Sequence, residues 1–538
     1  MQGSRLSKLA ALMALSVAAP AMAADVPAGV TLAKVQEIVR GNGDEVPTLD
    51  PAYSSDNASS RVIQDMFEGL VTQDLNGDIV PALATRWQAS DDRKVFTFEL
   101  RDDIKWSNGE PITAHDFEYS FKRVIDPKTA APYAWYYSTA HIANADAISS
   151  GEKAVESLGV KAIDDRTLQI TLDKPVPHFT KMLVHESMFP VNRKAVEAYG
   201  DRWTKPENIV TSSAYKLSNW VVNEKLVLER SPSYWNDTKT VINKVTYLPI
   251  QDLKSEYNRY LTGEIDITSA FPLELYNTIK KQRPDELLTV PSLGTYYYLF
   301  NIDQAPFDDA RVRKALAYAL DRDVITQVIL GQGQPPAYGV TPGSVAGFDA
   351  PELAWSEMNQ KERIIKAQQL MAEAGYDKTN PLKFELAYNT NESHKKLAIV
   401  MASMWKKTLG VEVELANQEW KTFLQKLSQK DFTVARYAWM GDYNEASTFL
   451  SYFETSGMNY SKWSNEAFDK AMQQASTASS DKERNSYYQQ AEKVFAQEMP
   501  AIPVYHYTRT VLKQPEVGGY SLKNASESRY TRDLYITK

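Results

Sequence analysis

Two hydrophobic periodicities alternate along this chain, and their alternation limits the fold more than any other feature. Residues 95–100 (VFTFEL) and 167–172 (TLQITL) alternate apolar and polar side chains with the two-residue period of a half-buried strand. Between them, Thr113 is a suitable N-cap for a helix from Ala114 to about Val124, before Asp126-Pro127. The alternation predicts an α/β or α+β protein with several strand–helix units.

The same alternation continues in the second half. One predicted helix has an apolar face and an N-cap at Asp308 or Asp309, and a second ends at Gly410. Their apolar faces consist of Val312, Ala315, Leu316, Ala319 and Leu320, and of Leu397, Val400, Met401 and Met404. Residues 411–415 and 431–438 have the composition of strands.

The N-terminus has the pattern of a secretory signal peptide. Arg5 and Lys8 precede an apolar run over residues 9–19, which is followed by Ala21-Met22-Ala23. The run is too short to span a bilayer, and no later segment has the ~20 apolar residues of a membrane helix. We expect cleavage after Ala23 and an exported, soluble mature protein that is not inserted in a membrane.

Composition excludes several classes of function. The chain has no cysteine, which removes disulfides, thiol catalysis, Fe–S clusters and Cys-zinc sites. Its formal charge of −8 makes nucleic acid an unsuitable partner. A chain of 538 residues predicts two or three lobes, and the scattered Gly and Pro predict short crossings between them.

No local catalytic signature is present. The sequence has no G-x-S-x-G elbow, Walker A loop or H-E-x-x-H helix, and His185-Glu186 lacks the second histidine of a zinc helix. Asp303, Asp308 and Asp309 lack the spacing of a calcium loop. We therefore predict no enzyme activity, no metal and no cofactor, although a triad assembled across the sequence stays an alternative.

The segment 439–445 (WMGDYNE) is the strongest local candidate for a binding site. It follows the strand-like residues 431–438 and combines an aromatic wall, backbone groups and the carboxylate of Asp442. These groups could hold an extended peptide by its backbone and its amino terminus. The alternative is that Asp442 only forms a turn at the end of the strand.

Six longer segments form a distinctive ordered set: residues 81–87 (PALATRW), 96–101 (FTFELR), 105–117 (KWSNGEPITAHDF), 208–235 (NIVTSSAYKLSNWVVNEKLVLERSPSYW), 417–424 (NQEWKTFL) and 442–450 (DYNEASTFL). These segments resemble the family 5 extracellular solute-binding proteins, the periplasmic receptors of peptide ABC importers. The resemblance covers essentially the whole mature chain and points to the oligopeptide-binding branch, with the murein-peptide-binding branch close to it.

The resemblance implies an α/β fold of the periplasmic-binding-protein-like type II, with three lobes and a ligand cleft between lobes I and III. We expect a signal peptide over residues 1–23 and a lobe I made of three separate segments. The expected boundaries are 24–67, 193–293 and 510–538 for lobe I, 68–192 for lobe II, and 294–509 for lobe III.

The resemblance also assigns site residues. Asp442 matches the carboxylate that binds the peptide's α-ammonium group, and Ala438 and Met440 match positions whose backbone pairs with the ligand. The remaining matches are the aromatic walls Trp439 and Tyr133, the lining position Tyr297, and the polar groups His185, His394 and Arg436 near the ligand's length or its carboxylate end.

Some positions depart from the family pattern. The best-known oligopeptide receptors carry basic residues where this chain has Leu330 and Leu427, and Ser55, Asp56 and Asn57 replace an N-terminal ligand-contact segment. Gly294 and Met440 stand where those receptors can carry a cysteine pair. Recognition of the ligand's amino end is therefore better supported than recognition of its carboxylate end.

The resemblance implies a monomeric periplasmic receptor that captures short peptides and delivers them to an inner-membrane ABC permease. A murein tripeptide, a nickel chelate or a sugar stays open as an alternative ligand. An exported hydrolase and a peptide-binding chaperone are the alternatives from other classes.

Overall fold

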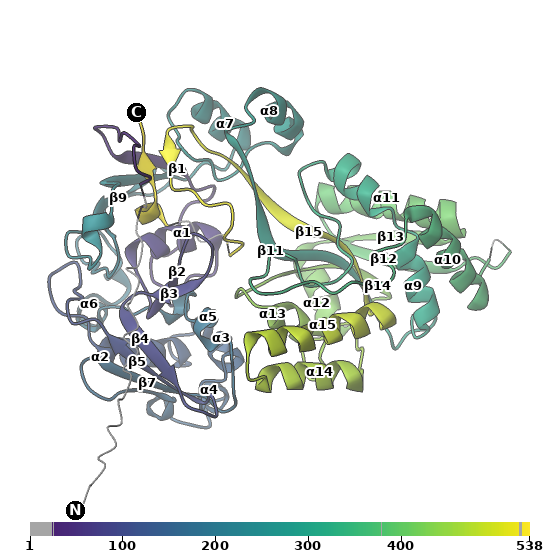
Figure 1. Cartoon of the computed structure of the whole chain (residues 1–538), viewed down its shortest axis with the longest axis horizontal. Coiled ribbons are helices and arrows are strands. Elements are labelled where there is room, and N and C mark those ends of the chain that lie inside the picture. Colours follow the sequence, from purple (N-terminus) through teal and green to yellow (C-terminus); the bar gives the residue numbers. More distant parts are fainter. Residues whose placement is uncertain (1–23, 25, 378, 527–529) are drawn as a thin grey trace, which may run out of the picture.

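The protein folds into three lobes, each with its own sheet and hydrophobic core (Figure 1). The structure is a computed structural model that describes residue 24 and residues 26–377, 379–526 and 530–538. The predicted signal peptide, residues 1–23, lies outside the described residues. We call the bodies lobes I, II and III after the sheets that define them.

Lobe I is built from segments that are far apart in the sequence. Its four-stranded sheet has the order β1-β10-β9-β8, and helix α1 packs beside it. Its core includes Ile38, Val245 and, from the C-terminal end, Leu534. The bounds are β1 Glu37–Gly41, α1 Asn57–Met66, α6 Arg193–Tyr199, β8 Tyr215–Val221, β9 Lys225–Arg230, β10 Lys244–Leu248, α7 Leu253–Leu261, α8 Tyr276–Gln282, β16 Val517–Gly518 and β17 Tyr535–Ile536.

Lobe II contains an antiparallel sheet of order β4-β5-β7-β6, covered by helix α2. Phe96, Phe98 and Leu100 alternate into its core, as the sequence pattern requires. The bounds are β2 Val71–Gln73, β3 Ile79–Pro81, β4 Ala84–Ala89, β5 Val95–Leu100, α2 Ala114–Ile125, α3 Ala134–Thr139, α4 Ala145–Ser149, β6 Val160–Ala162, β7 Thr167–Thr171 and α5 Phe179–Met182.

Lobe III is a five-stranded mixed sheet of order β13-β12-β14-β11-β15 with helices on both faces. Alternate residues of β11 pack into two hydrophobic cores, one on each face of the sheet. Tyr296 and Tyr298 belong to one core, and Tyr297 and Leu299 belong to the other. The bounds are β11 Leu287–Phe300, α9 Ala310–Tyr318, α10 Gln360–Glu373, β12 Lys383–Asn389, α11 Glu392–Leu409, β13 Glu412–Gln418, α12 Trp420–Gln429, β14 Val434–Met440, α13 Ser447–Leu450, α14 Glu466–Thr477, α15 Asp481–Glu498 and β15 Ala501–Leu512.

Strands β11 and β15 join lobe III to the rest of the molecule. They pair antiparallel from Leu287↔Leu512 to Leu299↔Ala501 and cross between the two halves of the molecule (Figure 1). The register shifts between Pro291 and Thr295, close to the crossing. Two paired strands make a short, continuous connection, which agrees with the prediction of short crossings between lobes.

The predicted secondary structure is confirmed where its local signals are strong. The capping box of α2 is present, with the Asp116 carboxylate accepting the Thr113 backbone N–H at 2.8 Å. Asp309, rather than Asp308, caps α9, and Gly410 ends α11 with a φ of 75°. The predicted strand over 431–438 begins later and extends further, because β14 pairs with β11 as far as Met440.

Candidate functional site

A cavity of about 250 Å³ lies where the three lobes meet. Its lining comes mainly from the loop before α1 and the first turns of that helix, from the segment after α5, and from the end of β14. The lining residues are Ser55, Asp56, Asn57, Ser60 and Gln64 from lobe I, Tyr133, Val184, His185 and Glu186 from lobe II, Met440, Gly441, Asp442 and Tyr443 from lobe III, Leu293 of the connecting strand β11, and Ser526 of the C-terminal segment.

Asp442 stands at the end of β14, where the chain turns into the cavity. The Gly441 N–H donates to the Leu293 carbonyl at 2.7 Å, and the Asp442 N–H donates to Thr448 Oγ1 at 3.3 Å. A Cβ at Gly441 would lie 2.9 Å from a methyl carbon of Thr448, so only glycine allows this close approach. The turn that aims Asp442 is therefore fixed by packing against α13.

The Asp442 carboxylate lacks a counter-charge. No other described residue donates a hydrogen bond to this carboxylate or forms an ion pair with it. Burial raises the pKa of Asp442 to about 6, because a desolvated carboxylate resists ionisation. A carboxylate held in a cavity without a cation is a preformed acceptor for one.

Aromatic rings from lobe II form the opposite wall. The Tyr133 ring lies 4.3 Å from the His185 ring, and the His185 ring lies 4.9 Å from that of Tyr136. Burial, and secondly the charge of Asp442, raise the pKa of Tyr133 to about 12. The Ser187 N–H donates to His185 Nδ1 at 3.2 Å, and burial lowers the pKa of this histidine, whereas the charge of Glu186 raises it.

Strand β14 offers a free edge next to this cavity. Its parallel pairing with β12 covers only Val434 and Ala435, whereas its antiparallel pairing with β11 runs to Met440. Because Gly441 and Leu293 form a hydrogen-bonded pair, the ladder alternates so that the N–H and C=O groups of Ala438 and Met440 point away from β11. These backbone groups can accept another strand.

Arg436 and His394 lie together, away from the Asp442 cavity. The Arg436 guanidinium lies 4.8 Å from the centre of the Tyr296 ring and donates to the Tyr507 hydroxyl at 3.1 Å. Its Nε and the Nδ1 of His394 are buried and have no hydrogen-bond partner among the described residues. Burial, and secondly the charge of Arg436, lower the pKa of His394 to about 4, so Arg436 carries the positive charge.

Two other predicted residues do not line the cavity. Tyr297 is 1% exposed and belongs to a core of lobe III. Trp439 packs against the same core, with its ring 5.5 Å from that of Tyr452, and its indole N–H donates to Thr448 Oγ1 at 3.4 Å. In this arrangement both side chains support β14 from the face opposite Ala438 and Met440.

Two of the departures from the family pattern have a physical reason in the structure. Leu427 is 1% exposed in a core of lobe III, where an arginine would lose its hydration. Gly294 lies directly opposite Met440 in the β11–β14 ladder, and a Cβ there would come within 2.5 Å of the Met440 sulfur. Glycine at position 294 thus leaves space for the Met440 side chain, which is 51% exposed.

A charged contact joins lobe II to the segment that carries Asp442. Glu445 is 4% exposed, forms an ion pair with Lys181 of α5, and accepts a hydrogen bond from Arg484 Nε at 2.8 Å. Burial alone would raise the pKa of Glu445, but Lys181, His178 and Arg484 lower it to about 2. The contact therefore stays charged and fixes the loop just beyond Asp442.

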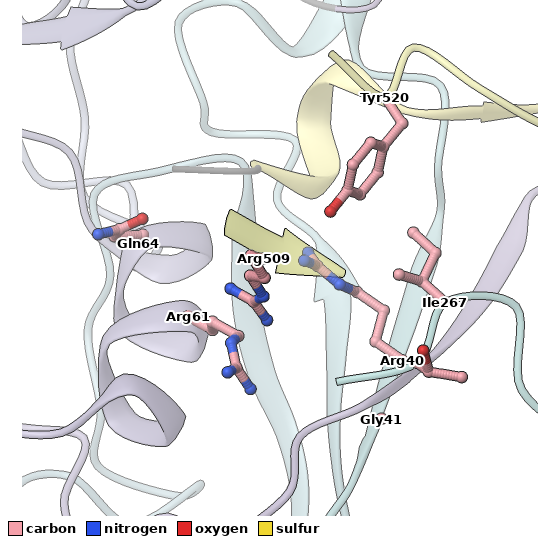
Figure 2. Close-up of a pocket in the computed structure, with 8 residues that line it drawn as sticks. Arg40, Gly41, Arg61, Gln64, Ile267, Arg509 and Tyr520 are labelled. Atoms are coloured by element: carbon pink, nitrogen blue, oxygen red, sulfur yellow. The ribbon is translucent and has the colours of Figure 1, made fainter. Parts of the chain in front are cut away.

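A second cavity beside helix α1 has a structural role. Figure 2 shows the side chains of Arg40, Arg61 and Arg509 turned toward a common space of about 20 Å³, room for about one water molecule. Arg40 also donates to Thr531 Oγ1 at 2.8 Å, which ties β1 to the C-terminal segment. Gln64 lines this cavity and the Asp442 cavity, but only the latter has room for part of a peptide.

The described residues contain no group of three or more His, Asp or Glu side chains placed to hold a metal ion. Within the same described ranges, no helix has both the length and the apolar character that crossing a membrane would require.

These features define a class of protein: a receptor of three lobes with a cleft between lobes I and III, in which a carboxylate and a strand edge face the opening. The family profile for bacterial extracellular solute-binding proteins, family 5, matches residues 78–461. The chain belongs to this family, as the sequence resemblance predicted.

Individual relatives agree with this assignment. The chain is 49% identical over 532 residues to the periplasmic oligopeptide-binding protein OppA of Escherichia coli K12, covering 98% of this chain and 97% of that protein. The unliganded open form of the murein tripeptide binding protein MppA superposes with a TM-score of 0.89 at 45% identity, covering 95% and 99% of the two chains.

A relative solved with a bound peptide gives a lower similarity. Haemophilus influenzae OppA in complex with the peptide RPPGFSPFR gives a TM-score of 0.75 at 42% identity, covering 94% of this chain and all of that one. The structure is thus more similar overall to the unliganded open form of MppA than to this peptide complex.

The sequence interpretation missed several lining residues. Of its nine site residues, Asp442, Met440, Tyr133 and His185 line the cavity, and the other five lie along β14 or behind it. Gln64 and Glu186 were not predicted as site residues. Gln64 sits one helical turn after Ser60, but no local pattern places α1 at the cleft, and Glu186 is visible only as the neighbour of His185.

Proposed function

We propose that this protein is a periplasmic receptor that captures short peptides and delivers them to an inner-membrane ABC importer. The observation that carries the proposal is the Asp442 carboxylate, which has no cationic partner among the described residues and stands at the end of a strand with a free edge. A peptide α-ammonium group supplies the missing charge, and the charge-assisted hydrogen bond strengthens when the cleft closes and excludes water.

In this proposal the ligand binds as an added strand. Its amino end meets Asp442, and its backbone pairs with Ala438 and Met440, which recognises a peptide without reading its side chains. The six residue steps from Asp442 back to Arg436 span about 20 Å of extended chain. A tripeptide would thus end short of Arg436, and a peptide of about six residues would bring its carboxylate there.

The lobes provide the closing motion. We propose the boundaries 24–67, 193–293 and 510–538 for lobe I, 68–192 for lobe II and 294–509 for lobe III, with a monomeric protein. The presence of Leu534 in the same core as Ile38 supports the return of the C-terminus to lobe I. The paired strands β11 and β15 are then the hinge about which lobe III closes on the ligand.

The decisive experiment compares trialanine with N-acetyl-trialanine by calorimetry. Acetylation removes the positive charge and leaves the rest of the peptide unchanged, so we expect binding of the free-amine peptide and loss of at least a hundredfold in affinity on acetylation, about the cost of breaking a buried charge pair. Equal affinities would refute the role of Asp442. Mass spectrometry of ligands copurified from the producing cell would separate plain peptides from murein peptides.

The pKa of Asp442 predicts the pH dependence of binding. The free carboxylate has a pKa of about 6, and only its ionised form attracts an ammonium group, so affinity falls as the pH decreases through 6. On the alkaline side, the peptide's α-amine loses its proton near pH 7.7–8.0. We expect calorimetry between pH 5 and 9 to give a maximum near pH 7 with proton release near pH 6, whereas a flat profile between pH 5 and 7 would contradict it.

The free edge of β14 predicts the effect of removing one backbone donor. Because the Ala438 N–H points away from β11, Ala438→Pro leaves that ladder intact and deletes a donor available to the ligand. We expect trialanine affinity to fall about tenfold, the contribution of one hydrogen bond. Ala438→Val keeps the N–H and is the control for side-chain bulk; unchanged affinity of the proline variant would show that the ligand does not use this edge.

A further inference from the structure

The Asp442 cavity has more negative charge than one ammonium group can neutralise. Asp56 of lobe I, Glu186 of lobe II and Asp442 of lobe III all line it, and no Lys or Arg occurs among its described lining residues. His185 also lines the cavity, and burial lowers the pKa of its imidazole although the neighbouring charge of Glu186 raises it. The tyrosines of the wall are uncharged near pH 7.

The three carboxylates differ in the groups that stabilise their negative charge. Asp56 is the N-cap of α1 and accepts the Ser59 N–H at 2.8 Å, so the helix N-terminus stabilises its charge. Asp442 is the acceptor for the ligand's α-ammonium group in the proposed function. Glu186 is the third carboxylate, and neither a helix N-terminus nor the ligand's α-ammonium group is assigned to it.

Glu186 is deeply placed and poorly compensated. It is 6% exposed, and its Oε1 accepts one hydrogen bond from Ser54 Oγ at 3.0 Å. No described Lys, Arg or His forms an ion pair with it within 4.0 Å. A hydroxyl group satisfies an oxygen atom but does not neutralise a charge, and buried carboxylates are normally paired with a cation.

We propose that Glu186 forms a second cation subsite, which selects ligands with a further positive charge beside the α-ammonium group. This inference rests on the proposed function and deepens it. The ligand class is peptides whose first residue is lysine, ornithine or another diamino acid. The aliphatic stem of such a side chain can pack on Tyr133 and Met440 while its ammonium group reaches Glu186.

The test compares Lys-Ala-Ala with norleucine-Ala-Ala by calorimetry at pH 7. Norleucine keeps the four-carbon stem and lacks the ammonium group, so the ratio of the two affinities isolates the charge. We expect the wild type to prefer the lysine peptide about tenfold or more, as a charge-assisted contact in a desolvated site would give. In Glu186→Gln the ratio falls to near one, and in Glu197→Gln, a control on the exposed surface, it is unchanged.

The outcomes separate this inference from the proposed function. Equal affinity of the two peptides in the wild type overturns the subsite while leaving peptide binding through Asp442 intact. If neither of these peptides nor trialanine binds, the proposed function itself is contradicted. If Glu186→Gln does not fold, the ratio of the two affinities in the wild type still tests the subsite. A preference that depends on charge decreases with added salt, because salt screens electrostatic attraction.

Discussion

Asp442→Asn is expected to weaken the binding of trialanine by at least about a hundredfold, because it leaves the peptide's α-ammonium group without its counter-charge in a closed cleft. Asparagine has nearly the same shape as aspartate, so the packing of the turn at Gly441 is retained. The affinity for N-acetyl-trialanine should change little, since that peptide carries no charge for Asp442 to bind. Calorimetry with both peptides on both proteins completes a thermodynamic cycle.

Thermal stability provides the control for this variant. The folded-state pKa of Asp442 is raised above its usual value, so its ionisation near pH 7 opposes folding, and the stability that the protonated form retains is lost as the pH rises through about 6. Asparagine cannot ionise, and the ligand-free variant should melt at the same temperature as the wild type or higher. Loss of affinity together with a lower melting temperature would indicate a damaged fold instead of a lost ion pair.

Arg532→Met is expected to destabilise the protein by about 3–5 kcal/mol, because it leaves the buried Glu68 carboxylate without its ion-pair partner. Glu68 is 2% exposed and accepts hydrogen bonds from Arg532 at 2.7 Å, Trp235 Nε1 at 2.7 Å and the Tyr234 hydroxyl at 3.0 Å. Arg532 comes from the C-terminal segment, and its other nitrogen donates to Thr72. The pair therefore holds together three distant parts of the chain.

Urea unfolding followed by tryptophan fluorescence measures this effect, with the first transition as the readout because a protein of three lobes need not unfold in one step. Arg193→Met, which breaks the exposed Arg193–Glu197 pair, is the control and should cost at most about 1 kcal/mol. Adding Glu68→Gln to Arg532→Met should recover part of the loss, since no buried charge is then left unpaired. A loss no larger than that of the control would contradict the role given to this pair.

Local signals in the sequence predicted individual strands and helix ends. The period of residues 95–100, the Thr113 cap and the glycine at 410 each act over a few neighbouring residues, and the structure has a strand, a capping box and a helix end there. The end of β14 was misplaced by two residues, because a strand ends where its partner ends, and β11 continues to Gly294 opposite Met440.

The family resemblance carried the site prediction further than periodicity could. It named Asp442, Met440, Tyr133 and His185, which converge on one cavity although they are separated by as many as 309 positions in the chain. It also named Tyr297, whose side chain lies in a core of lobe III. A resemblance transfers positions, but the burial of each side chain depends on its own neighbours.

The sequence by itself determined the family and the alternation of strands and helices, and it predicted Asp442 as the anchor for an ammonium group. Only the tertiary structure decided that β12 leaves the edge of β14 open beyond Ala435, that Leu427 is a core residue, and that Glu186 shares a cavity with Asp442. The reason is physical: periodicity and caps depend on adjacent residues, whereas an open edge, a buried position and a shared cavity depend on where the lobes come together.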